Sequence, residues 1–522
     1  MHDHPDIMRR RLLTLVSTMV AGNAISAPAR KEKIVFAQYP FSLGVASGSP
    51  TAAGVVLWTR LMGEFEARDA IPVRWEVFEE GKQDKPVISG TATAIADLAY
   101  SVHVEVEGLR PGRWYGYRFM SGDEVSPTGR TRTMPAADDA SGSLRFAYAS
   151  CQRWEHGYYA AYRHMLAESL DLVLFVGDYI YEYAGKNVKD AVRSHDLPLI
   201  RTLDDYRARY ALHRSDLDLQ KMHAACPWLV TMDDHDVEDN HAGGVSVFGT
   251  KDFEAKRIAA YQAFYEHMPV RSDSLIRGLE GLKRSGGLRI YQRISFGRLA
   301  EFHVLDNRQY RDAPLCGARP SPTMAAVCRK KDNRTSTMLG MEQERWLDTG
   351  LGQAARRKTQ WNFLVQQTAF SPRNYGFGEG SHAGTDAWDG FPSSRERLIA
   401  SIVAERPRNP VFIGGDLHQN WVANVHQTPY DAHSRVIASD FCGTSITSRG
   451  VSAQRSRTVA DANPHCLYAN AAYRGYGVVQ VNGERGTVRL RGVRNVADRD
   501  SPINTLAEFT IKNGVPGTVR RT

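Results

Sequence analysis

Four groups of polar residues in this 522-residue chain each follow directly on an apolar run. They occupy residues 150–152, 177–182, 233–240 and 414–421. Such runs predict strands, and the carboxyl ends of strands in an α/β sheet lie along one edge, where side chains distant in sequence can meet. The groups supply thiol, phenol, imidazole, amide and carboxylate donors, which together predict a metal site.

The spacing within two groups lets side chains share one site. In Asp178-x-x-Tyr181 a turn after the strand directs the carboxylate and the phenol to the same point. In Asp416-x-His418 the two residues alternate along an extended segment, so their side chains also face the same point. Tyr181, His418 and Cys151 favour a transition metal, and Fe(III) is the natural partner of a phenolate.

Other members of these groups offer oxygen. Asp234, Asp239, Asn240 and Asp416 suit a hard divalent ion such as Ca²⁺, and Asp178 has two oxygens with which to bridge two ions. Two metals about 3.5–4 Å apart clamp the attacking and leaving oxygens of phosphoryl transfer. The residues therefore indicate a centre of two unlike metals that acts on phosphate esters.

The elements that must position these groups lie in residues 143–512, where strands alternate with helices. We expect an α/β layered fold of two packed mixed β-sheets flanked by helices. Strands are predicted to end at Ala149 and to span 172–176, 228–232, 299–305, 361–365, 411–413, 436–438 and 478–481, with helices at 158–169 and 252–268. A last strand is expected near 506–511, followed by a frayed tail.

The N-terminal part of the chain has a different pattern of apolar and polar residues. Between residues 38 and 134, short runs alternate apolar and polar residues, as at 73–77 and 102–106, and residues 109–119 read as a turn and its following strand. This pattern predicts an N-terminal all-β sandwich of the immunoglobulin or fibronectin kind. Small and polar residues at 135–143 then form a linker.

The polar groups, in this order along one chain, resemble the alkaline phosphatase D family, the PhoD-like metallophosphatases, which are distantly similar to purple acid phosphatases. Further motifs that carry the resemblance lie at 41–50, 56–60, 305–311, 387–392 and 441–447. The resemblance implies that Cys151, Asp178, Tyr181 and His418 bind Fe³⁺, that Asp178 also bridges to Ca²⁺, and that Asp416 binds the second metal.

A further ligand of the second metal has two candidates. Residues 233–236 resemble the Gly-Asn-His-Glu/Asp motif of metallophosphatases, with Asp234 in the Asn position, while Asn240 offers an amide. Where relatives often carry two Asn residues after this motif, the chain has Asp239 followed by Asn240, which is expected to alter the charge at the calcium site.

Catalytic roles are assigned to Asp178 and His235. Because His235 adjoins a metal ligand, we expect it to donate a proton or a hydrogen bond to the leaving oxygen. Arg308 is expected to brace the sheet edge. Structural roles are expected for four other histidines, His303, His382, His433 and His465.

The function expected is that of a secreted alkaline phosphatase or phosphodiesterase acting on small phosphate mono- or diesters. A phospholipase D-like or nucleotide phosphodiesterase is the nearest alternative, and access past residues 375–380 and Trp388 is expected to decide between them. A surface binding protein is the alternative from another class, although it would not need Asp178, Tyr181 and His418 together.

Composition and the N-terminus limit partners and location. With 42% hydrophobic and 24% charged residues the chain is an ordinary globular protein, and its net charge of +8 includes no dominant basic run, so no obligate nucleic-acid partner is expected. Residues 1–29, with arginines at 9–11 before an apolar stretch, read as a twin-arginine export signal recognised by the translocation machinery. Asn23 and Ser26 interrupt the run too early for a membrane anchor, so a periplasmic or secreted location is expected.

Six cysteines are too few to build a disulfide scaffold in a chain of this length. In an oxidising compartment Cys316 with Cys328, and Cys442 with Cys466, could form bridges because each pair lies in a loop-like stretch. Cys151 is expected to stay unpaired.

Overall fold

The structure is a computed structural model that describes residues 34–66, 69–140, 142–274, 288–313, 335–375 and 384–521. The chain divides into two compact units. Unit 1 comprises Met1–Thr133, Arg201–Pro227 and Asp252–Ile290, and unit 2 comprises Met134–Ile200, Trp228–Lys251 and Tyr291–Thr522. The predicted export segment, residues 1–29, lies outside the described residues. All four polar groups belong to unit 2.

The first sheet of unit 2 has a parallel centre and antiparallel flanking strands. Its strand order is β22-β21-β20-β19-β9-β10-β11, with β9, β10 and β11 parallel. The central strand β10 is buried throughout, as expected for a parallel strand covered on both faces. The strands are β9 (Leu144–Ala149), β10 (Leu172–Val176), β11 (Trp228–Thr231), β19 (Arg474–Val481), β20 (Arg485–Val493), β21 (Ile503–Lys512) and β22 (Val515–Arg520).

The second sheet of unit 2 is also mixed, in the order β12-β13-β14-β15-β17-β16-β18, with β13, β14, β15 and β17 parallel. Phe146 of the first sheet packs edge-on against Phe302 and Phe363 of the second, at ring centroid distances of 5.2 and 4.9 Å, within one buried core. The strands are β12 (Gln292–Phe296), β13 (Ala300–Val304), β14 (Trp361–Val365), β15 (Pro410–Gly414), β16 (Asn420–His426), β17 (Val436–Cys442) and β18 (Cys466–Asn470).

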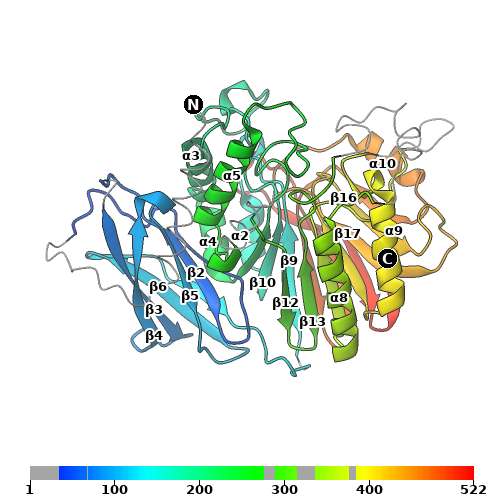
Figure 1. The fold of residues 1–522 in the computed structure, drawn as a ribbon, viewed down its shortest axis with the longest axis horizontal. Coiled ribbons are helices and arrows are strands. Elements are labelled where there is room, and N and C mark those ends of the chain that lie inside the picture. Colours follow the sequence, from blue (N-terminus) through cyan, green and yellow to red (C-terminus); the bar gives the residue numbers. More distant parts are fainter. Residues whose placement is uncertain are drawn as a thin grey trace. The chain divides into compact units, whose positions relative to one another are not determined.

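Helices flank these sheets. α8 (Met341–Arg357) and α9 (Pro392–Glu405) lie side by side, and their apolar residues share a core with β14, β15 and β17 (Figure 1). The unit also contains α2 (Ala160–Leu166), α10 (Ala453–Asp461) and the short 3-10 helices η2 (Trp154–His156), η3 (Gly185–Asn187) and η4 (Trp388–Gly390). The layered arrangement of two mixed sheets with flanking helices is therefore confirmed.

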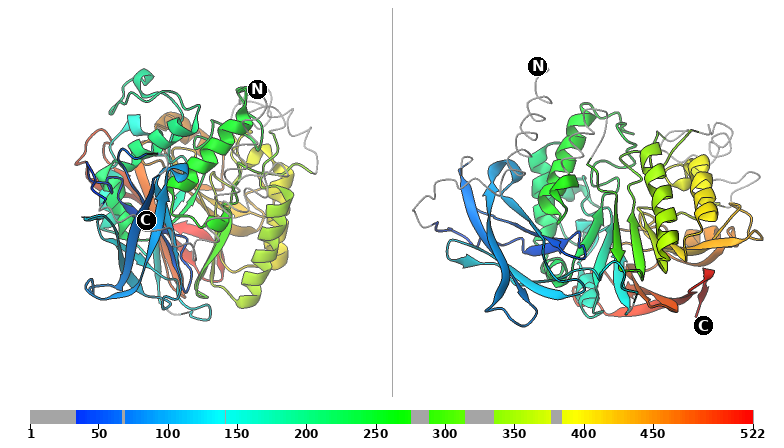
Figure 2. Two further views of the ribbon diagram at one scale, coloured as in Figure 1. Left: turned by 60° about the vertical axis from the view of Figure 1, so that its left-hand side comes forward. Right: turned by 60° about the horizontal axis from the view of Figure 1, so that its bottom comes forward.

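Unit 1 contains two groups of antiparallel strands, β1-β2-β5 and β4-β3-β6-β7, with β8 paired to β6. Residues of both groups form one core. The blue strands in Figure 2 belong to this unit. The strands are β1 (Val45–Gly48), β2 (Val55–Arg60), β3 (Ala70–Glu79), β4 (Pro86–Ile95), β5 (Ser101–Val106), β6 (Trp114–Ser121), β7 (Glu124–Val125) and β8 (Gly129–Arg132), with the 3-10 helix η1 (Ala96–Leu98) between β4 and β5.

Three helices from the middle of the chain join unit 1: α3 (Leu203–Arg214), α4 (Leu217–Ala225) and α5 (Phe253–His267). The indole N–H of Trp58 in β2 donates to the carbonyl of Glu266 in α5 at 3.0 Å. Arg207 of α3 pairs with the buried Glu266 carboxylate at 2.6 Å. These contacts explain why α5, which sequence alternation assigns to the α/β layers, groups instead with the front strands.

Two expectations about the chain differ from the structure. The expected frayed tail is wrong, because β22 pairs with β21 through a turn in which Gly514 has φ 80°, and Asn-Gly favours such tight hairpins. Cys442 and Cys466 are free, because β16 separates their strands by two spacings of about 4.8 Å, too far for a disulfide. Cys316 and Cys328 lie outside the described residues.

Within the described ranges, none of the helices combines the length and the apolar character that a membrane span requires.

Candidate active site

The candidate ligands stand in strained backbone positions directly after strands. Cys151 follows β9, Asp178 follows β10, and Asp416 and His418 follow β15. All four have left-handed φ values, of 59°, 57°, 63° and 52°. Such a conformation costs a residue other than glycine about 1–3 kcal/mol and is typical of functional sites. The strand ends therefore turn sharply to direct these side chains to one place.

A glycine lets two of the ligand-bearing loops approach each other. Gly177, at the end of β10, has φ 103°, and a Cβ atom there would lie 2.3 Å from Cβ of Asp233. Only glycine fits that approach.

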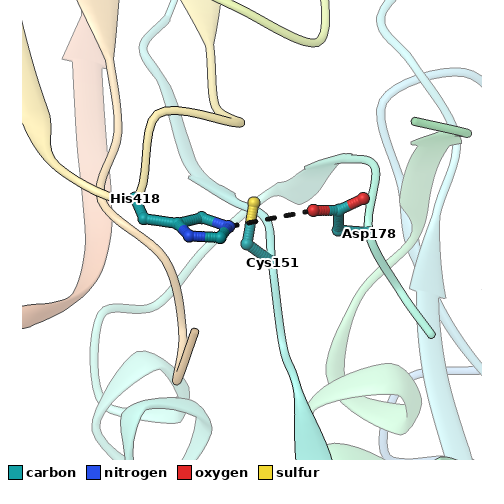
Figure 3. A group of neighbouring side chains, drawn as sticks. All are labelled: Cys151, Asp178 and His418. Atoms are coloured by element: carbon teal, nitrogen blue, oxygen red, sulfur yellow. Dashed lines mark ion pairs between the residues drawn. The ribbon is translucent and has the colours of Figure 1, made fainter. Parts of the chain in front are cut away.

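Cys151, Tyr181 and His418, called here the soft-ligand group, converge on Asp178. The phenol of Tyr181 donates to Oδ2 of Asp178 at 2.8 Å and lies 3.2 Å from Nε2 of His418. Nε2 of His418 is 3.9 Å from the same carboxylate oxygen, and Sγ of Cys151 lies within 4.8 Å of both groups. Figure 3 shows the imidazole and the carboxylate on either side of the sulfur.

The tautomer of His418 and the protonation of the other two members follow from their surroundings. Nδ1 of His418 donates to the carbonyl of Arg449 at 2.7 Å, which leaves Nε2 free to accept a cation. Burial, followed by the nearby Asp178 carboxylate, raises the pKa of the Cys151 thiol and of the Tyr181 phenol. Both side chains therefore keep their protons until a cation displaces them.

Asp233, Asp234 and Asp416, called here the carboxylate group, surround the buried guanidinium of Arg308. Arg308 pairs with Asp233, and its Nη2 atom lies 3.4 Å from Asp416 and 3.7 Å from Asp234. Burial raises the pKa of Asp416 to about 7. For Asp234 burial acts in the same direction, but the nearby charges of Arg308 and His235 and the N–H of Asn240 together outweigh it and lower the pKa. Arg308 therefore acts as an internal counter-ion. The expectation that Arg308 braces the sheet edge did not include this compensation of the carboxylate charges.

Asp178 links the two groups, because its carboxylate belongs to a cluster with Cys151 and His418 and to a second cluster with Asp234 and His235. The ligand atoms within each cluster lie within 4.8 Å of one another. Among the described residues, Oδ1 of Asp178 and Oδ1 of Asp234 are buried without a hydrogen bond. Buried carboxylate oxygens are costly unless hydrogen-bonded or coordinated. The donor set thus fits cations: a transition metal at the soft-ligand group and a hard divalent ion at the carboxylate group.

Another buried carboxylate, that of Asp236, holds the ligand-bearing loops after β10 and β11. Its Oδ2 accepts from the backbone N–H groups of Asp178 and Asp233 at 2.9 Å each, and its Oδ1 accepts from those of Tyr179 and Ile180 at 3.0 and 3.2 Å. Burial raises the pKa of Asp236 to about 8, although these donors oppose the shift. The two loops therefore keep one relative position.

His235 is oriented by Glu182 and by the aromatic ring of Tyr181. Nδ1 of His235 lies 2.9 Å from Oε2 of Glu182, and the imidazole lies against the ring of Tyr181, tilted by 34°, with centroids 4.3 Å apart. Burial opposes the charged form, yet Glu182 and Asp234 raise the pKa of His235. One ring nitrogen of His235 lies within 4.8 Å of carboxylate oxygens of Asp178 and Asp234.

Asp239 and Asn240, the alternative oxygen donors, lie beside this cluster. The backbone N–H of Asn240 donates to Oδ2 of Asp234 at 2.7 Å, and Oδ1 of Asp239 is 4.0 Å from Nε2 of His235. Among the described residues, Asp239 belongs to none of the groups whose His, Cys or carboxylate ligand atoms gather within 4.8 Å. Both stay candidates for the second metal.

Other residues singled out in the sequence lie elsewhere. His303 is buried in β13, His465 contacts the carbonyl of Pro372 at 2.7 Å, His433 is exposed, and His382 falls outside the described residues. Trp388 is fully buried against Phe370, so its expected role in substrate access is wrong. Residues 376–380 of the access loop lie outside the described residues.

Sequence reasoning missed Glu182, Asp386 and Ser448. Asp386 bridges the guanidinium groups of Arg308 and Arg311 at 2.7 Å each. The available signal for Glu182 was its position directly after Tyr181. No short motif marks Asp386 or Ser448, because their partners are distant in sequence.

Comparisons with known proteins agree with this geometry. The model of the PhoD-like phosphatase family matches residues 146–490, and that of the PhoD-like phosphatase N-terminal domain matches residues 26–135. Alkaline phosphatase D of Bacillus subtilis (strain 168) is 41% identical over 497 residues, which cover 92% of this chain and 82% of the relative. The solved structure of PhoD superposes with a TM-score of 0.86 at 41% identity, over 94% of this chain and 93% of that one.

The fold, the convergent donors and these matches together define a phosphoric ester hydrolase. Within that class the chain belongs to the PhoD-like phosphatase family, which confirms the resemblance drawn from the motifs. The alternative of a non-catalytic surface binding protein is not supported.

Proposed function

We propose that the protein hydrolyses small phosphate mono- and diesters at a mixed Fe(III)/Ca²⁺ centre. The observation that carries this proposal is the position of the Asp178 carboxylate, which lies between donors of two different chemical types. Cys151, Tyr181 and His418 with Asp178 would hold Fe(III), and Asp234 and Asp416 with Asp178 would hold Ca²⁺, with Asn240 as a further candidate ligand. When bound, the two ions would supply positive charge for the phosphoryl oxygens and activate water.

The protein's own groups would then position the reacting ester. His235 is proposed to give a proton to the leaving oxygen through Nε2, because Glu182 occupies Nδ1. Arg308 would keep Asp233, Asp234 and Asp416 together while their negative charges repel one another. Asp236 would hold the loops of Asp178 and Asp233 in register through its four backbone hydrogen bonds.

Metal analysis combined with a panel of substrates tests this proposal. The purified protein should contain iron and calcium and should be coloured, because thiolate and phenolate donors absorb visible light by charge transfer to Fe(III). It should hydrolyse p-nitrophenyl phosphate, bis(p-nitrophenyl) phosphate or both. Chelation should abolish this activity and added Ca²⁺ should restore it. A colourless, iron-free, fully active enzyme would contradict the mixed-metal centre and indicate two zinc or two calcium ions instead.

The same panel separates the alternative substrates. A phospholipase D-like or nucleotide phosphodiesterase would prefer phosphatidylcholine or a dinucleotide to the small nitrophenyl esters. The substrate with the highest kcat/KM identifies the class of ester.

We also propose that residues 1–29 direct twin-arginine export to the periplasm or the medium. The support is the arginine series at 9–11 ahead of an apolar stretch. Replacing Arg9 and Arg10 with Lys should leave the enzyme in the cytoplasm, because the receptor recognises the guanidinium pair and not charge alone. Normal export of the Lys pair would reject the proposal.

For the front of the chain we propose an immunoglobulin- or fibronectin-like sandwich within residues 38–134, followed by a catalytic domain over 143–512. Its support is the shared core of the two antiparallel strand groups of unit 1.

A further inference from the structure

The segment 445–450, which follows β17, supplies none of the candidate metal ligands yet contacts every member of the soft-ligand group. The backbone N–H of Ser448 donates to the carbonyl of Cys151 at 3.2 Å. The carbonyl of Arg449 accepts from Nδ1 of His418 at 2.7 Å. Oγ of Ser448 lies 2.7 Å from the phenol oxygen of Tyr181. One segment thus touches three residues that arrive from three different strand ends.

The hydroxyl of Ser448 has a defined set of neighbours. It is fully buried, and its oxygen accepts from the backbone N–H of Arg153 at 3.2 Å. Its single proton can go to the carbonyl of Cys151 at 2.8 Å or to the oxygen of Tyr181 at 2.7 Å. The choice depends on which of these two acceptors is more negative.

Coordination of a metal ion by the Tyr181 oxygen, as the proposed function requires, would decide that choice because the phenol proton then leaves. While Tyr181 is neutral it donates its own proton to Oδ2 of Asp178 at 2.8 Å. As a phenolate it becomes an anionic acceptor, and hydrogen bonds to charged acceptors are about twice as strong as neutral ones. Nε2 of His418 cannot donate to it in the tautomer that its bond to Arg449 fixes, whereas Ser448 can.

The guanidinium of Arg474 keeps Ser448 in place. It donates to the carbonyl of Ser448 at 3.0 Å, to the carbonyl of His418 at 2.5 Å and to Oγ of Ser445 at 3.1 Å. Gly450 allows the close return of the segment, since a Cβ atom there would lie 2.3 Å from the carbonyl oxygen of His418. The Ser448 hydroxyl is therefore fixed relative to the imidazole as well as the phenol.

We propose that Ser448 is a positioning residue that donates a hydrogen bond to the Tyr181 phenolate and thereby sets the orientation and the donor strength of this iron ligand. The inference rests on the proposed function, because it requires Tyr181 to bind Fe(III). Ser448 does not contact the metal; it acts through Tyr181.

Ser448→Ala tests the proposal in the iron-loaded protein. Without the hydrogen bond the phenolate becomes a stronger electron donor, so its charge-transfer band should move to longer wavelength. The variant should also lose iron to an external chelator faster, with an iron affinity lower by about 10–100-fold. Absorption spectroscopy and metal analysis report both effects independently of turnover.

Thr444→Val provides the matched control. Thr444 is buried one residue before the segment, and its hydroxyl donates to the carbonyl of Tyr473, which is not a ligand candidate, at 2.8 Å. Both changes remove one buried hydroxyl that contacts a backbone carbonyl, and only Ser448→Ala removes a contact to Tyr181. Thr444→Val should keep the band and the iron-release rate of the unaltered protein.

A double-mutant cycle separates positioning from general support of the loop. In a Tyr181→Phe background, Ser448→Ala should cause no further change in iron release, because the phenolate acceptor is already gone. Equal acceleration of iron release in both backgrounds would overturn the proposal, as would a band in Ser448→Ala that matches Thr444→Val. If the unaltered protein holds no iron and has no visible band, the proposed function itself fails, which is a distinguishable result.

Discussion

The soft-ligand group and the carboxylate group hold their charge in different ways. Burial raises the pKa of Cys151 and Tyr181, so these ligands remain neutral in the absence of a cation. The carboxylate group includes the anionic Asp234, whose charge the buried guanidinium of Arg308 compensates. The soft-ligand group thus holds protons on its thiol and phenol, whereas the carboxylate group combines an ion pair with Asp416, whose pKa burial raises to about 7.

This difference has a consequence for metal binding. A cation that binds the soft-ligand group must displace protons from the thiol and the phenol, so its affinity is expected to depend on pH. A cation that binds the carboxylate group meets oxygens already held by Arg308.

The largest effect should come from Asp178→Asn, which removes the charge that both groups share. We expect iron and calcium contents to fall together and activity to drop by at least about a hundredfold, because outer partners of metal ligands alone cost 10–100-fold. Metal analysis and steady-state kinetics would measure this. Asp171→Asn, next to β10 at the opposite end of the strand, is the control. Loss of only one metal would show that Asp178 does not bridge.

Arg308→Met should break the carboxylate group without touching the soft-ligand group. Removing one partner of a buried ion pair costs about 3–5 kcal/mol, so the free energy of unfolding of the chelated protein should fall by that amount. Added Ca²⁺ should recover part of the loss, since it replaces the missing positive charge.

The matched control is Arg395→Met, which breaks the buried pair of Arg395 and Asp389, at 2.6 Å, in α9 and η4. It should be destabilising to a similar degree, but without recovery by Ca²⁺. Equal behaviour of the two variants in denaturant titrations with and without Ca²⁺ would refute a counter-ion role for Arg308.

Glu182→Gln should leave both metals in place, so it separates proton donation by His235 from metal binding by the two ligand groups. The amide cannot hold the Nδ1 proton of His235 as the carboxylate does, so proton donation from Nε2 becomes less effective. We expect kcat for esters with poor leaving groups to fall by about 10–100-fold, with little change for p-nitrophenyl esters, which need no proton. A uniform loss across leaving groups would mean that Glu182 serves the fold or the metals instead.

The smallest effect should come from Thr368→Val, whose hydroxyl donates to Oδ2 of Asp416 at 3.2 Å. Loss of this bond, worth about 1 kcal/mol, should lower the Ca²⁺ affinity roughly fivefold and leave the iron band unchanged. Calcium titration followed by activity measures the change. Thr518→Val, which removes a hydroxyl bond to the carbonyl of Thr510 in the C-terminal hairpin, should change neither property.

Strand positions were predictable because burial on both faces leaves a continuous apolar run. The runs at 172–176 and 361–365 coincide with β10 and β14. The helix expected at 158–169 is shorter in the structure, at Ala160–Leu166. The grouping of α3, α4 and α5 with the front strands was not predictable, because contacts such as Trp58 to Glu266 span 208 residues.

The site was predictable where ligands directly follow strands, and not where function depends on contacts between loops. Cys151, Asp178 and His418 were found from residue type and position, and they converge in the structure. Arg308 was found, but its role as a counter-ion depends on Asp233, 75 residues away. Ser448 contacts Tyr181 across 267 residues, a separation that no local pattern encodes.

The left-handed backbone at Cys151, Asp178, Asp416 and His418 bears on how such a protein evolves. Glycine adopts this conformation without steric cost, so each of the four side chains carries a backbone strain of about 1–3 kcal/mol that glycine would avoid. This strain is a local cost of keeping the candidate ligands in place. A laboratory lineage selected for heat resistance alone should accumulate glycine or asparagine at these positions first, and its loss of colour would accompany its gain in melting temperature.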